Sequence, residues 1–172
     1  MVAGLAGVAC TPAFNWREVR DAESGYAVLL PAKPASMTRE IDLDGMRVSM
    51  TMTGARTEQC LFSVAVASLG ADDEKLRQHA LVAMRTAMLR NVGAMPVEPG
   101  AGTVMRVDAS GATTGRLDAV TIEAAGHVAG DPVILHAVFV AQGDRALQAV
   151  AITPPREAAQ ARTMLDSFRI IR

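Results

Sequence analysis

The feature that most constrains the fold is the stretch 60–69, CLFSVAVASL, because it carries apolar residues at both odd and even positions. One parity carries Phe62, Val64 and Val66, and the other carries Leu61, Ala65 and Leu69. Successive side chains of a strand point to opposite faces of a sheet, so a strand of this kind needs cover on both faces. The stretch therefore predicts a central strand, and we expect helices to supply the cover.

Residues 72–93 change the apolar period from two to 3.6, which predicts one long amphipathic helix. Its apolar stripe consists of Leu76, Ala80, Ala83, Met84, Ala87, Met88 and Val92. Acidic residues stand at the start of this segment, and Gly93 stands at its end as a C-cap residue. We interpret Met84 and Met88 as core packing rather than as soft-metal ligands.

The sequence Asp44-Gly45 is typical of the tight turn of a β-hairpin. Residues 38–43 and 46–53 flank it, and both alternate apolar and polar side chains. Each predicted strand is therefore apolar on one face only, and we expect this hairpin near the edge of a sheet with its polar face toward water.

The other predicted elements are strands separated by Gly-rich or Pro-containing turns, followed by a terminal helix. The strands are expected at 16–19, 26–30, 103–108, 116–125, 132–141 and 145–153. Pro155 opens the terminal helix, whose buried side is predicted to include Ala161, Leu165 and Phe168. We interpret residues 14–172 as a single α+β domain.

Residues 1–10, MVAGLAGVAC, are uncharged and apolar, which is typical of the apolar region and cleavage site of an export signal. We interpret residues 1–13 as the remnant of such a signal and a linker. The end of the segment resembles a bacterial lipobox, which implies lipidation of Cys10; the lipobox prefers Leu where this chain has Gly7. Secretion without lipid, a cytosolic location, and a disulfide between Cys10 and Cys60 are the alternatives.

Composition excludes several classes of partner. A net charge of −1 and 3% aromatic residues provide neither a basic surface nor stacking platforms, so nucleic acid is not expected. Residues 100–102, Gly-Ala-Gly, are too short for a nucleotide fingerprint, and no cofactor is expected. No apolar run reaches the ~20 residues of a bilayer span, so membrane contact is expected through a lipid anchor alone.

The residues that carry chemistry do not form a recognisable site. On a hairpin turning near Gly130, His127 and His136 would share a face with Glu123, yet two imidazoles fall short of a zinc site. No serine lies in a G-x-S-x-G motif, and Cys60 is interpreted as a small buried residue. The sequence therefore predicts no catalytic, cofactor or metal residues and a protein that is not an enzyme.

Several segments together resemble the PsbP-like families of exported bacterial proteins. They are Trp16, the motif Gly25-Tyr26-x-Val28-x-Leu30-Pro31-x-Lys33-Pro34, and the terminal pair Ser167-Phe168. The resemblance implies an α-β-α sandwich, in which an antiparallel sheet has helices on both faces. It implies little about function, because such domains serve as accessory, assembly or protein-binding modules.

From these observations we expect a non-enzymatic, periplasmic accessory or protein-binding module, anchored to a membrane by lipid at Cys10. Its expected partner is another envelope protein. The second hypothesis is a soluble periplasmic carrier of a small ligand, and the third is a hydrolase with an unrecognised site.

Overall fold

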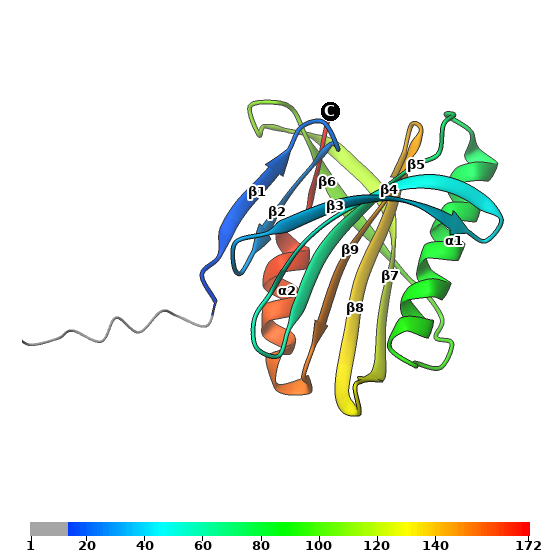
Figure 1. Cartoon of the computed structure of the whole chain (residues 1–172). Coiled ribbons are helices and arrows are strands. Elements are labelled where there is room, and N and C mark those ends of the chain that lie inside the picture. The colour runs from blue at the N-terminus through cyan, green and yellow to red at the C-terminus, as the bar shows by residue number, and fades with distance from the viewer. Residues whose placement is uncertain (1–13) are drawn as a thin grey trace, which may run out of the picture.

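The computed structural model describes residues 14–172, so Cys10 and the predicted export signal lie outside the described residues (Figure 1). Ten strands, two α-helices and one short 3-10 helix make up this part of the chain. In order they are β1 (Arg17–Asp21), β2 (Tyr26–Leu30), β3 (Ala35–Leu43), β4 (Met46–Arg56), β5 (Leu61–Ser68), α1 (Glu74–Asn91), β6 (Gly100–Val107), β7 (Thr113–Val128), β8 (Asp131–Gln142), β9 (Arg145–Thr153), η1 (Pro155–Glu157), α2 (Ala158–Ser167) and β10 (Arg169–Ile171).

All ten strands belong to one sheet with the order β1-β2-β10-β6-β7-β8-β9-β5-β4-β3. Neighbouring strands are antiparallel except β10, which runs parallel to β6. The predicted central strand is β5, which pairs with β9 on one side and with β4 on the other. The sheet is therefore mixed, and it joins strands from both ends of the described chain.

The sheet curls until distant strands meet. Trp16, just before β1, packs edge-on against Phe62 of β5 with 5.6 Å between ring centroids. Six strands separate β1 from β5 in the sheet order. Phe14 stacks on Trp16 and also meets Phe62, so three aromatic rings hold the two regions together.

The alternating side chains of β5 divide between two hydrophobic clusters. The first core cluster, which contains α2, includes Tyr26, Val28, Leu30, Phe62, Val64, Val66, Ala161, Met164, Phe168 and Ile170. The second core cluster, which contains α1, includes Leu43, Val48, Met50, Ala65, Ala67, Ala80, Ala83, Met84, Leu135 and Phe139. Both parities of β5 are buried, as the sequence pattern predicts.

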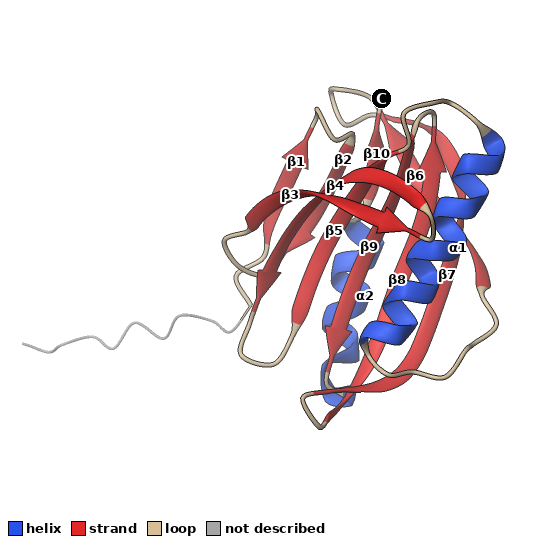
Figure 2. Cartoon of the chain, turned by 45° about the vertical axis from the view of Figure 1, so that its right-hand side comes forward, coloured by secondary structure: helices blue, strands red, loops and turns tan. Residues whose placement is uncertain are grey.

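The predicted fold class, an antiparallel sheet inside an α-β-α sandwich with helices on both faces, is wrong. The two helices have only 18 and 10 residues, and Figure 2 shows them against a much larger area of strand. Much of the cover for β5 comes from the curled sheet itself, including β2 and the Trp16 ring. A doubly apolar strand demands cover, but its pattern does not distinguish a covering helix from a covering strand.

The long helix predicted at 72–93 is confirmed as α1. The Asp73 side chain accepts hydrogen bonds from the backbone N–H groups of Lys75 and Leu76, at 2.8 and 3.0 Å, and caps the N-terminus. At the other end, Gly93 has φ 60° and its N–H donates to the Arg90 carbonyl. The N–H of Ala94 donates to the Leu89 carbonyl, which completes a Schellman motif.

The predicted hairpin is also confirmed. Asp44 and Gly45 have φ values of 55° and 84°, as a type I′ turn requires, and they join β3 to β4. β3 is the last strand of the sheet, which agrees with the expected edge position. Between residues 14 and 172, neither helix combines the length and the apolarity needed to cross a bilayer.

The end of α1 touches β7 directly. The His127 backbone N–H donates to the Val92 carbonyl at 2.7 Å, beyond the point where β6 stops pairing with β7. Gly126 permits this approach, because a Cβ there would overlap the Val92 carbonyl oxygen and lie 2.9 Å from Val92 Cγ2. A glycine at 126 therefore fixes the distance between α1 and the sheet.

Replacing Gly126 with alanine tests this contact. The added methyl group would force backbone against backbone, and we expect Gly126→Ala to lower the free energy of unfolding by about 2 kcal/mol. Urea denaturation measures the change. Ala125→Ser, at the exposed neighbouring position, is the control and should leave stability nearly unchanged. Equal stability of Gly126→Ala and the parent protein would contradict the close approach.

Candidate functional site

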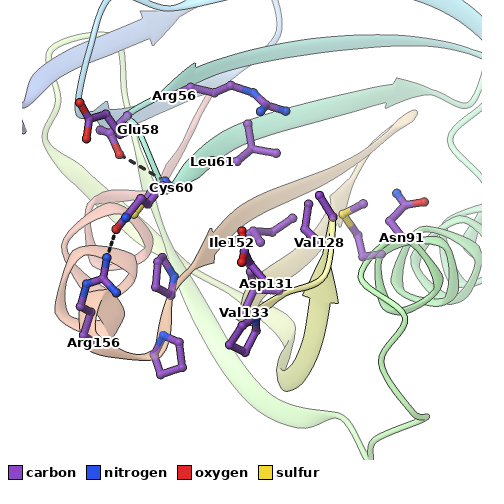
Figure 3. A pocket seen from close by; sticks show the side chains of 17 residues that line it. Arg56, Glu58, Cys60, Leu61, Asn91, Val128, Asp131, Val133, Ile152 and Arg156 are labelled. Carbon is purple, nitrogen blue, oxygen red and sulfur yellow. Dashed lines mark hydrogen bonds between the residues drawn. The ribbon is translucent and has the colours of Figure 1, made fainter.

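An open groove of about 590 Å³ lies at one end of the sheet (Figure 3). We call it the β5 groove. It is bordered by the β4–β5 loop, the β7–β8 turn, the start of η1 and the last turn of α1. Its apolar lining includes Leu61, Met88, Val128, Pro132, Val133, Ile152, Pro154 and Pro155.

Unequal strand lengths create the groove. Ile134 opposite Thr153 is the last pair between β8 and β9, so β8 extends three residues further, from Asp131 to Val133. β5 begins at Leu61, opposite Ile152 of β9. The β7–β8 hairpin therefore projects past its neighbours, and the space beside it has apolar side chains at its base.

A closed turn forms the wall opposite that hairpin. The Thr57 N–H donates to the Cys60 carbonyl at 3.0 Å, and the Cys60 N–H donates to the Thr57 hydroxyl at 3.3 Å. Arg156 of η1 donates a hydrogen bond to the Gln59 side-chain oxygen, which joins this wall to the start of α2. These bonds give the wall a defined shape.

The rim of the β5 groove carries charges of both signs. Arg56 and Arg156 are basic, whereas Glu58 and Asp131 are acidic. In Figure 3, Arg56, Glu58 and Arg156 lie toward the outside of the labelled side chains, whereas Asp131 lies beside Ile152 and Val133. An apolar base with a charged rim is the usual organisation of a protein-binding surface.

Cys60 borders the groove but does not have the properties of a nucleophile. Its side chain is 4% exposed and forms no disulfide with another described residue. Burial raises the pKa of the Cys60 thiol, although its hydrogen bond with Thr57 acts in the opposite direction. The thiol therefore stays protonated near neutral pH, in agreement with its interpretation as a small buried residue.

The histidines are dispersed. His79 Nε2 lies 2.9 Å from the Asp44 carbonyl oxygen and 3.5 Å from its carboxylate. His127 and His136 share a face, but the register places His127 opposite Pro132 and His136 opposite Glu123. Four residues along a strand correspond to about 13 Å, so the shared face is confirmed but the two imidazoles stand apart.

No group of three or more His, Cys, Asp or Glu side chains in residues 14–172 has the geometry of a metal site. Ser167, the serine of the terminal motif, is used structurally: its hydroxyl accepts from the Leu29 N–H and donates to the Met164 carbonyl. It thereby joins α2 to β2. The β5 groove was not predicted from the sequence, because its walls consist of segments whose sequences are typical of ordinary turns.

His136 is a buried titratable group outside the groove. It is 8% exposed, its Nδ1 lies 3.3 Å from Glu123 Oε2, and its Nε2 is buried without a hydrogen-bond partner. Burial lowers the pKa of His136; Glu123 opposes this change and Arg162 of α2 adds to it. The folded protein therefore favours the neutral imidazole.

This lowered pKa predicts a pH-dependent stability. The unfolded chain takes up the His136 proton near pH 6.5, whereas the folded chain takes it up at a lower pH. The free energy of unfolding should therefore fall as the pH drops below about 6.5. Urea denaturation at pH 7.5 and 5.5 measures this change. Between these two pH values, the free energy of unfolding should fall less for His136→Gln than for the parent protein. The control His127→Gln, at an exposed position, should retain the loss of unfolding free energy seen in the parent protein. An unchanged loss in His136→Gln would refute the assignment.

Comparison with known proteins identifies the fold. The sequence matches no protein-family model and no curated protein. The structure is similar to the solution structure of cyanobacterial PsbP (CyanoP) from Synechocystis sp. PCC 6803, with a TM-score of 0.54 and 14% sequence identity. The match covers 99% of this chain and 98% of that chain. At this identity the likeness concerns architecture alone, and on that basis the chain has a PsbP-like fold.

Proposed function

We propose that this chain is a non-enzymatic accessory module of the bacterial cell envelope that binds another envelope protein in the β5 groove. In this proposal it resides in the periplasm and is anchored to a membrane by lipid on Cys10. The location rests on the sequence of residues 1–10 and on the lipobox resemblance. The binding role rests on the groove.

The observation that carries the binding role is the open, apolar groove with a rim of mixed charge. Apolar surface gathered in one depression is typical of an interaction site. Val128, on the groove wall, is 43% exposed although it is a large aliphatic side chain. Covering it and its apolar neighbours with a partner would remove this surface from water, which favours association.

The two other hypotheses receive less support. A small-ligand carrier encloses most of its ligand, whereas the β5 groove is open beside Val128. A hydrolase needs a nucleophile beside a base. His79 and His136 contact carboxylate or carbonyl oxygens, and Cys60 is a buried, protonated thiol.

Photo-crosslinking in living cells tests the proposal. A photoreactive amino acid at Asn91, an exposed groove residue at the end of α1, should form one discrete adduct with a different protein. Val128→Asp places a charge on the apolar groove wall and should reduce the adduct about tenfold, because a partner would have to desolvate that charge. The yield is read from immunoblots, and mass spectrometry identifies the adduct.

Val82→Asp is the matched control, because Val82 lies on α1, is 49% exposed and does not border the groove. This variant should leave the adduct unchanged, and both variants should unfold at the same temperature as the parent. An adduct that persists in Val128→Asp, or one that contains two copies of this chain, would contradict the proposal.

A further inference from the structure

The β5 groove lies close to Phe14, the first described residue, and this position indicates the kind of partner that the groove binds. We infer that the β5 groove faces the membrane that carries the Cys10 lipid, and that it binds the membrane-proximal segment of an integral membrane protein. This inference rests on the proposed function and adds a direction and a partner class to it.

The described chain begins beside the groove. Phe14 borders a second hollow of about 540 Å³, together with Glu157 and residues 56–60. Residues 56–60 also border the β5 groove, so one loop separates the two hollows. The first described residues are held there, because Phe14 packs on Phe62 and the Asn15 N–H donates to the Pro31 carbonyl at 2.8 Å.

Covalent geometry limits the distance from this point to a lipid on Cys10. Cys10 precedes Phe14 by four residues, which reach at most about 14 Å when fully extended. β7 alone has 16 residues and measures about 50 Å, so the tether is short relative to the molecule. A protein anchored in this way must keep its Phe14 end, and with it the groove, close to the bilayer surface.

The shape and charge of the groove favour a protein segment over the lipid surface itself. A bilayer is locally flat, whereas the apolar residues Leu61, Val133 and Ile152 lie at the base of a hollow. Anionic lipid attracts clusters of basic residues, whereas this rim includes Glu58 and Asp131 beside its arginines. A polypeptide segment can insert apolar side chains and pair with charges of both signs.

Changing the tether tests the inference. A rigid helical spacer of 20 residues, inserted between Pro12 and Ala13, would move the groove about 30 Å from the anchor. With the photoreactive residue at Asn91, we expect this insertion to abolish the adduct with an integral membrane protein. A flexible Gly/Ser insertion of equal length still permits return to the membrane, and it should reduce the adduct several-fold without abolishing it.

The controls separate this inference from the proposed function. Intact mass should show acylation of Cys10, and Cys10→Ser should release the protein from the membrane fraction. If it does not, the proposed lipid anchor is wrong. If the anchor holds but the adduct survives the rigid spacer, or is formed with lipid or with a soluble protein, the groove does not face a membrane-proximal segment and this inference alone fails.

Discussion

The structure depends on the burial of both faces of β5. Phe62, Val64 and Val66 enter one core cluster, while Ala65 and Ala67 enter the other. Two helices of 18 and 10 residues cannot cover both faces of a ten-stranded sheet, so the sheet curls and covers part of itself. The contact between Trp16 and Phe62, across six intervening strands, marks the point where the curl closes.

The β5 groove follows from the same architecture. The strands at this end of the curled sheet have unequal lengths. The β7–β8 hairpin therefore projects beyond the end of β9 at Thr153 and the start of β5 at Leu61. The Schellman motif after α1 and the bond from His127 to the Val92 carbonyl fix the helix end beside that hairpin. The apolar side chains exposed between these elements form a surface whose burial would require a partner.

Local signals predicted the elements better than their assembly. The capped helix α1 and the Asp44-Gly45 turn depend on neighbouring residues, and both were predictable. β10 was not predicted, because three residues are too few to show a strand period. They form a strand through their pairing with β6 and β2. The predicted fold class was wrong because the sequence indicates that both faces of β5 are buried but does not indicate whether helices or strands cover them.

The candidate site was less predictable than the fold. Residues 56–60 and 128–133 are separated by about 70 positions and contain no motif, so no pattern indicates that they enclose one groove. The histidines were visible in the sequence, but register alone determines that His136 meets Glu123 and stands apart from His127. The structural similarity supports the PsbP-like resemblance, but the α-β-α sandwich that the resemblance implied is wrong. The resemblance left function open, as the structural similarity at 14% identity also does.

If the β5 groove is the surface at which this protein meets its partner, binding should protect the backbone amides of the groove. Hydrogen–deuterium exchange of the full-length protein, with and without detergent-solubilised envelope membranes, measures this protection. We expect slower amide exchange in residues 57–61 and 128–133 together, with no change around Gly143, which borders a separate polar hollow. Protection around Gly143 alone, or unchanged exchange in both groove segments, would contradict it.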